Sequence, residues 1–243
     1  MKILAIEASS LVASVAILTD DIITAEYSMN HKITHSQTLM PMIDEIIKRT
    51  DTVIEELDAV AVSAGPGSFT GLRIGSATAK GLGQALNIPL IHVPTLDAMA
   101  YNAFGYDGLI CPIMDARRSQ VYTGIYSFEG QDLKIHLENT AISIDELMEK
   151  LNSMNQRVLF IGDGIPVFTD FIKEHGTFEC CFAPANMNRQ RAASVATLGA
   201  VYYAKGFTEQ PQEHLPEYLR VSQAERERAE RIARGGQNNA DNH

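Results

Sequence analysis

The residues best placed for anion chemistry form the run GPGS at 65–68, which ends an apolar stretch and precedes a helical one. A glycine turn before a helix N-terminus can bind a phosphate through its backbone N–H groups. A GxxxxGK[ST] phosphate loop needs lysine after its last glycine, but Gly71 is followed by Leu72 and Arg73. The run therefore favours close packing over phosphate binding, although the ligand alternative stays open.

The serines and histidines give weaker indications of catalysis. Ser9, Ser63 and Ser68 have no evident base partner, and GPGSFTG is not the GxSxG motif of a serine nucleophile. His31 and His35 are four residues apart, but two ligands alone make no closed metal site, and we expect capping or surface roles. The three cysteines, Cys111, Cys180 and Cys181, form no CxxC and are interpreted as reduced core thiols.

Two consecutive predicted helices present unusual faces. In the second helix, Gly71, Gly75, Ala79 and Gly83 recur every four residues. Glycine inside a helix costs about 1 kcal/mol relative to alanine, so this stripe of small residues indicates that another backbone lies very close. In the first helix the apolar residues spread over roughly 160°, where one sheet requires about 100°. Either its own domain buries two sides of that helix, or a partner covers part of this apolar face, which comprises Leu39, Met40, Met42, Ile43, Ile46 and Ile47.

The elements that position these residues follow a repeated order. Apolar periodicity predicts three strands, a helix, a strand and a helix, and then the same order again. The predicted strands cover residues 2–8, 12–19, 22–28, 58–64, 89–93, 109–115, 120–128, 133–142, 157–161 and 177–182. The predicted helices cover residues 36–48, 70–86, 95–104, 144–152, 167–174 and 192–203.

Individual residues mark the expected helix starts. Ser36 or Thr38 would cap the first helix, with Pro41 in about its first turn. Ser68 or Thr70 would cap the glycine-bearing helix, and Thr95 the next one.

The duplicated βββαβα order predicts an α/β fold of two similar lobes that meet at a cleft. The first lobe would span residues 1–105 and the second 106–220, and the last helix, about 192–205, can pack back on the first lobe. Residues 221–243 are predicted to form a charged, disordered tail, because arginine and glutamate alternate from Glu225 to Arg234 and the residues that follow are mostly polar.

Composition restricts the class of protein. With 45% hydrophobic residues the 243-residue chain can bury a proper core. The net charge of −10 argues against a chain that binds nucleic acid unaided, since such binding depends on lysine and arginine neutralising phosphates. The chain shows neither a signal peptide nor an apolar run of about 20 residues, so we expect a cytoplasmic protein without membrane association.

Five segments together resemble the bacterial TsaB (YeaZ) family across nearly the whole chain. The most specific is GPGSFTGLRIG at 65–75, preceded by VSA. The others, in the family's order, are IEASS at 6–10, HSQTLMPMI at 35–43, DARRSQVYTGIY at 115–126 and PEYLR at 216–220. The resemblance implies a two-lobed actin/Hsp70-like (ASKHA) fold with mixed sheets, in agreement with the repeat.

The resemblance also implies a function and partners. Members of this family help to form threonylcarbamoyladenosine at position 37 of tRNAs that read codons beginning with A. They act as non-catalytic partners of the sister subunit TsaD, with the ATPase TsaE in the larger assembly, and they homodimerise when alone. The tRNA would be met through the complex. The contact runs through the first lobe's two helices, here Leu39, Met40, Met42, Ile43, Ile46, Ile47, Phe69, Gly71, Leu72, Arg73, Gly75, Ser76, Ala79, Lys80 and Gly83.

The resemblance finally bears on cofactors. The catalytic sister family holds a metal with two histidines in a VNHxEGHxxA segment, where this chain has VPTLDAMAYN with Thr95 and Met99. A thioether is a poor ligand for a hard cation, so we expect no metal and no cofactor of the chain's own. ATP, ADP and metal would belong to the partner subunits, with a weak nucleotide at the interface at most. The wider fold holds phosphates between two hairpins, which predicts a vestigial cleft of Glu7, Ser9, Ser10, Asp115, Arg117, Gly162 and Gly164.

Two alternatives from other classes remain at this point. The first is an ATP-dependent phosphotransferase or ATPase that uses the actin-like cleft, with Glu7 and Asp115 as paired carboxylates. The second is a metallopeptidase. It is the less favoured of the two, because Thr95 and Met99 stand in place of both histidines.

Overall fold

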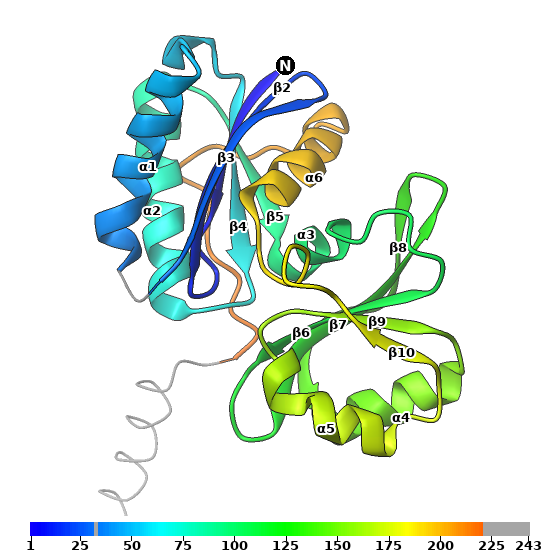
Figure 1. Cartoon of the computed structure of the whole chain (residues 1–243). Coiled ribbons are helices and arrows are strands. Elements are labelled where there is room, and N and C mark those ends of the chain that lie inside the picture. Colours follow the sequence, from blue (N-terminus) through cyan, green and yellow to red (C-terminus); the bar gives the residue numbers. More distant parts are fainter. Residues whose placement is uncertain (32–33, 221–243) are drawn as a thin grey trace, which may run out of the picture.

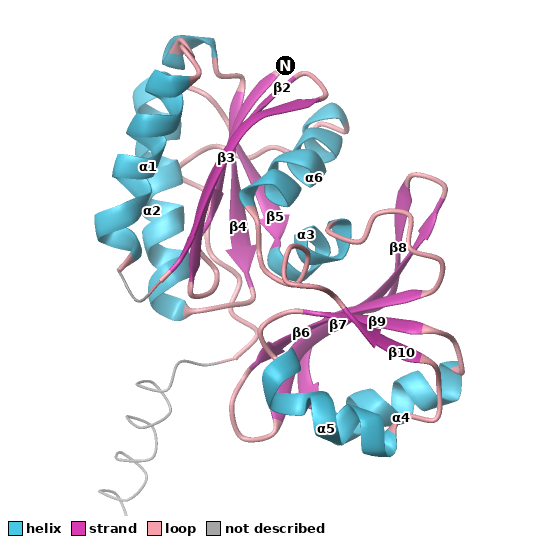
Figure 2. Ribbon diagram, in the orientation of Figure 1, coloured by secondary structure: helices cyan, strands magenta, loops and turns pink. Residues whose placement is uncertain are grey.

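A computed structural model describes residues 1–31 and 34–220 of the chain. It contains two five-stranded sheets, each flanked by helices (Figures 1 and 2). The strand orders, β3-β2-β1-β4-β5 and β8-β7-β6-β9-β10, are the same pattern repeated, which confirms the duplicated α/β architecture. The predicted charged tail at 221–243 lies outside the described residues. Among the described residues, no helix combines the length and apolar character that a membrane crossing requires.

The first sheet is built on a central parallel pair, β1 and β4. Its strands are β1 (Lys2–Glu7), β2 (Val12–Thr19), β3 (Ile22–Asn30), β4 (Ala59–Gly65) and β5 (Leu90–Pro94). A short 3-10 helix, η1 (Ile54–Glu56), precedes β4. Side chains alternate across β1: Leu4 and Ile6 join one buried cluster, and Ile3 and Ala5 join another on the opposite face. Both faces of this sheet therefore need a cover.

Helices from distant parts of the chain provide the two covers. Helices α1 (His35–Arg49) and α2 (Phe69–Leu86) pack on the Leu4 face, and α6 (Ala192–Ala204) packs on the Ile3 face (Figure 1). Helix α6 is apolar around its circumference, as expected for a helix buried among other elements. The last helix thus lies on the first sheet.

The second sheet has the same arrangement. Its strands are β6 (Leu109–Asp115), β7 (Gln120–Glu129), β8 (Asp132–Ser143), β9 (Val158–Ile161) and β10 (Cys180–Phe182). Helices α4 (Ile144–Met154) and α5 (Ile165–His175) cover one face. The short α3 (Thr95–Tyr101) contacts the other face and lies between the two sheets (Figure 2).

Two helix starts differ from the sequence prediction. Helix α1 begins at His35 after Thr34, so Pro41 lies in its second turn. The earlier start follows from packing, because the His35 Nε2 atom lies 2.7 Å from the backbone oxygen of Ser10. Thr95 is the first residue of α3 rather than its cap, which is Pro94. Ser68 caps α2 as predicted, with its Oγ accepting a hydrogen bond from the Gly71 N–H at 3.3 Å.

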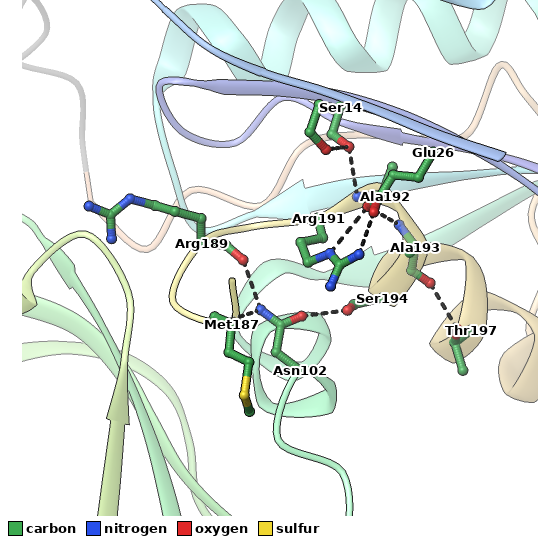
Figure 3. Close-up of polar contacts among 11 residues, drawn as sticks. Ser14, Glu26, Asn102, Met187, Arg189, Arg191, Ala192, Ala193, Ser194 and Thr197 are labelled. Atoms are coloured by element: carbon green, nitrogen blue, oxygen red, sulfur yellow. Dashed lines mark hydrogen bonds and ion pairs between the residues drawn. The ribbon is translucent and has the colours of Figure 1, made fainter. Parts of the chain in front are cut away.

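Strands β2 and β3 cap α6 from outside the helix (Figure 3). Ser14 Oγ accepts a hydrogen bond from the Ala192 N–H at 3.1 Å, and Glu26 accepts one from the Ala193 N–H at 3.0 Å. Glu26 also pairs with the Arg191 guanidinium at 2.5 Å. A carboxylate beside the first turn of a helix is stabilised by the helix dipole. These contacts fix α6 on the first sheet.

Candidate functional site

A cavity of about 730 Å³, lined by both polar and apolar residues, lies where the two lobes meet. Its first-lobe wall contains the β1–β2 turn, the start of α1 and the start of α2. Its second-lobe wall comes from the end of β6 and the turn after β9. Among the residues that line it are Ser9, Ser10, Thr34, His35, Gly67, Ser68, Phe69, Asp115, Arg117, Tyr122, Asp163 and Arg220.

The GPGS run forms the wall where α2 begins. The Ser68 N–H donates to the backbone oxygen of Ser9 at 2.7 Å. A Cβ on Gly67 would lie 2.2 Å from that same oxygen, so glycine is required for the approach of these two backbones. At this turn, the packing interpretation accounts for the conformation without a ligand.

The two predicted carboxylates occupy different environments. Glu7 is 1% exposed and lies behind the cavity wall, where one carboxylate oxygen accepts hydrogen bonds from the N–H and Oγ of Ser9, both at 2.6 Å. Burial raises the pKa of Glu7 to about 7. Asp115 lines the cavity and pairs with the Arg117 guanidinium at 3.1 Å. Because Glu7 does not line the cavity, the structure does not place the two carboxylates as a facing pair.

The predicted glycine pair after β9 is structural, and the residue between its members lines the cavity. A Cβ on Gly162 would lie 2.2 Å from the Ile113 oxygen, and the Gly164 N–H donates to that oxygen at 3.0 Å. Asp163 lies in the cavity wall, and its burial raises its pKa. Sequence reasoning missed Asp163, although it stands between two glycines that were selected.

Arg220 is a second charged residue in the cavity wall that the predicted cleft did not include. Its guanidinium donates to the backbone oxygen of Ala116, far away in sequence. Together with Arg117 and the N-terminus of α2, it gives the cavity the means to hold a small anion. The carboxylates of Asp115 and Asp163 oppose such binding.

The stripe of small residues on α2 packs against the chain's own first lobe. A Cβ on Gly71 would lie 2.1 Å from the Ala8 oxygen, and one on Gly75 3.1 Å from the Ala8 Cβ. Ala79 is fully buried, and a Cβ on Gly83 would meet Leu90 at 2.9 Å. The expectation that a second subunit covers this stripe is therefore corrected: its close neighbours are Ala8, which follows β1, Leu90 of β5 and Pro211.

Most of the wide apolar face of α1 is also buried within the lobe. Leu39, Ile43 and Ile46 belong to the core, and Met42 and Ile47 pack partly against it. On α2, Leu72 and Ser76 are likewise buried. Of the apolar residues expected to contact a partner through α1, Met40 is the exposed one in the described structure, at 50%.

Three further predicted interface residues on α2 hold the C-terminal strap, which we define as residues 207–220. Phe69 stacks on Tyr218 with ring centroids 4.3 Å apart, and the Arg73 Nε donates to the Tyr218 hydroxyl at 3.2 Å. The Lys80 ammonium donates to the His214 backbone oxygen at 2.8 Å. These side chains have intramolecular roles that the sequence prediction did not include.

Comparison with known proteins identifies the family. A family model described as "TsaD: tRNA N6-adenosine threonylcarbamoyltransferase" matches residues 26–228. The "tRNA threonylcarbamoyladenosine biosynthesis protein TsaB" of Bacillus subtilis is 34% identical over 93% of this chain and 96% of its own length. The chain belongs to the TsaB family.

Solved structures agree with this membership at the level of fold. YeaZ from Pseudomonas aeruginosa superposes with a TM-score of 0.77 at 23% identity, over 90% of this chain and 99% of that one. An inorganic polyphosphate/ATP-glucomannokinase from Arthrobacter superposes with a TM-score of 0.50 at 11% identity, over 82% of this chain and 98% of that one. The predicted actin-like architecture of this TsaB family member is confirmed.

In this TsaB family member, helix α3 has a structural role between the lobes. Thr95 and Met99, which stand where the resemblance places the sister family's histidines, are both buried. The Asp97 carboxylate accepts hydrogen bonds from the Tyr126 hydroxyl and the Asn139 amide, both at 2.9 Å. Burial raises the pKa of Asp97, and these hydrogen bonds act in the opposite direction. The helix thus ties the second sheet to the lobe interface.

Cys111 is a buried core thiol as predicted, whereas Cys180 and Cys181 are only partly buried. Burial raises the pKa of the Cys111 thiol to about 12, which keeps it protonated and unreactive. His35 is buried against Ser10, whereas His31 is exposed. A different group, His92, Glu209 and His214, gathers possible metal-ligand atoms within 4.8 Å of one another, and the sequence spacing gave no signal for it.

Proposed function

We propose that this chain is a non-catalytic subunit that binds TsaD and supports threonylcarbamoyladenosine formation at position 37 of tRNAs that read ANN codons. TsaE would join the larger complex, and the tRNA would be contacted through that complex. Membership of the TsaB family supports the pathway. The cleft supports a non-catalytic role, because Ser9 binds the buried Glu7 and Arg117 binds Asp115.

The outer face of α1 and α2 is the surface we assign to the partner. The two helices lie side by side along one side of the molecule (Figure 1). Their exposed positions include Met40 and Pro41 on α1 and Ala77 and Gly81 on α2. Methionine adapts its shape to different partners, which suits a surface that also mediates self-association in the absence of TsaD.

Substitutions on this face test the proposal. Met40→Glu and Ala77→Glu each place a charge at the proposed contact, and we expect at least about a tenfold loss of affinity for TsaD, or roughly 1.4 kcal/mol. Binding is measured by calorimetry with purified TsaD, and homodimerisation by light scattering. Val167→Glu is the matched control, because Val167 is 58% exposed on α5 of the other lobe. Unchanged TsaD affinity in both α1 and α2 variants would contradict the assignment.

A weak ATP site in the cleft is the second candidate function. The 730 Å³ volume and the two arginines, Arg117 and Arg220, favour it. Calorimetry with ATP and magnesium on the isolated chain tests it. Tight binding that Arg220→Ala abolishes, together with turnover, would favour the phosphotransferase alternative over the scaffold.

A further inference from the structure

We propose that His92, Glu209 and His214 form a binding site for one divalent transition-metal ion, with Zn²⁺ as the metal of choice. This site is separate from the cleft and from the outer face of α1 and α2. It lies where the C-terminal strap crosses β5 at the edge of the first sheet. Two imidazoles and one carboxylate are a donor set that suits zinc.

Backbone contacts fix the first two ligands before any metal binds. Leu90 and Glu209 exchange two backbone hydrogen bonds, of 2.9 and 3.0 Å, as an antiparallel bridge. Side chains two residues apart on a strand lie on the same face, so the His92 side chain is on the same face as that of Leu90. Glu209 pairs with Leu90, so its side chain lies on that face too. The result is a distance of 3.9 Å between His92 Nδ1 and a Glu209 carboxylate oxygen.

The third ligand comes from the buried part of the strap. His214 is 0% exposed, and the Lys80 ammonium holds its backbone oxygen at 2.8 Å. Its Nδ1 lies 2.5 Å from the same Glu209 oxygen that faces His92. Two elements, β5 and the strap, therefore bring the three candidate ligand atoms within 4.8 Å of one another.

A purely structural role for the cluster leaves both ring nitrogens of His92 without a hydrogen bond among residues 1–31 and 34–220. The His214 Nδ1 atom has the Glu209 carboxylate as its partner, so within this part of the chain His92 is the member of the cluster that lacks one. Each nitrogen of His92 lies 3.9 Å from a carboxylate, Nδ1 from Glu209 and Nε2 from Glu217, which is beyond hydrogen-bond distance. Zinc bonds of about 2.0–2.1 Å in a tetrahedron place ligand atoms roughly 3.3 Å apart. This value lies between the two distances from the Glu209 oxygen, 2.5 Å to His214 Nδ1 and 3.9 Å to His92 Nδ1.

The surroundings supply what a metal site needs beyond its ligands. Glu217 faces His92 Nε2, the ring nitrogen that would not bind the metal. A carboxylate in this position orients a metal-bound imidazole. A cavity of about 360 Å³ is lined by His92 and Glu209 together with Tyr202 and Phe207. Three protein ligands leave one coordination position, which this cavity would supply with water. The bound ion would join the strap to the sheet edge.

Zinc binding by the full chain tests the proposal. After treatment with EDTA and dialysis, the protein is titrated with Zn²⁺ by calorimetry, and bound zinc is counted by mass spectrometry. We expect one zinc per chain and a higher unfolding temperature with zinc than with EDTA. His92→Ala and Glu209→Gln should each weaken zinc binding by at least about a hundredfold, and Glu217→Gln by about 10–100-fold.

Two controls separate this site from other donors. His136 is exposed on β8, away from the cluster, and His136→Gln should bind zinc as the parent does. The adjacent thiols of Cys180 and Cys181 are the other soft donors, and replacing both with serine should leave the stoichiometry at one. The proposal is wrong if zinc does not bind, or if binding survives in both His92→Ala and Glu209→Gln. Both variants alter partly exposed side chains, so they avoid the fully buried His214.

Discussion

Alanine substitutions at three glycines of α2 give a graded test of how this helix is packed. Gly71→Ala places a Cβ 2.1 Å from the Ala8 carbonyl oxygen, so helix and strand must separate by roughly 1 Å to restore contact distance. Such overpacking costs about 1–3 kcal/mol. In the described structure, a Cβ on Gly81 would meet no non-neighbouring atom within 4 Å, so Gly81→Ala should stabilise by about 1 kcal/mol. Gly75→Ala, at 3.1 Å from Ala8 Cβ, should fall between them.

Thermal unfolding of the isolated chain, followed by circular dichroism at low protein concentration, measures the difference. A span of roughly 2–4 kcal/mol between Gly81→Ala and Gly71→Ala corresponds to about 4–16 °C for a chain of this size. If the stripe existed to contact a second subunit, Gly71→Ala would leave the isolated chain stable and weaken association instead. Equal melting temperatures for the two variants would refute the intramolecular packing argument.

Three further substitutions test buried polar groups, each by chemical denaturation of the isolated chain. Burial raises the pKa of Glu7 to about 7, above its ordinary 4.5. Between these pH values the folded state holds a proton that the unfolded state has lost, so stability falls as pH rises through them. Glu7→Gln should flatten this dependence of stability on pH, and an unchanged slope would exclude Glu7 as its source. Glu26→Ala should lower the free energy of unfolding by about 1–2 kcal/mol, because it removes the acceptor for the Ala193 N–H and a partly buried ion pair. An unchanged free energy of unfolding would show that α6 needs no such cap. Asp97→Ala should cost about 2–3 kcal/mol, since it takes an acceptor from the buried Tyr126 hydroxyl, and a loss below 0.5 kcal/mol, roughly the value for a surface site, would contradict that.

The order of the elements was predictable because it depends on local periodicity. Leu4 and Ile6 alternate with Ile3 and Ala5, a pattern typical of a strand buried on both faces. Ser68 was predictable as a cap from its type and position. The sequence predicts a start of α1 one residue later than the structure shows, because a tertiary contact to Ser10 rather than local capping decides it.

The composition of the site was less predictable, because it depends on contacts between distant segments. The sequence showed that α2 must approach a backbone closely, but not that this backbone belongs to Ala8. Arg220 reaches the cleft through the path of the strap, which no periodicity encodes. His92, Glu209 and His214 likewise meet through the antiparallel bridge at Leu90 rather than through any spacing.

The position of α6 has a consequence for how the protein is made. One face of the first sheet, including Ile3 and Ala5, stays bare until residues 192–204 have left the ribosome, after the whole second sheet has been synthesised. During most of translation the N-terminal strands therefore expose an uncovered apolar surface. Chaperones bind surfaces of this kind. A fragment that stops at residue 105 would carry that surface permanently and should aggregate, even though it includes every strand of its sheet.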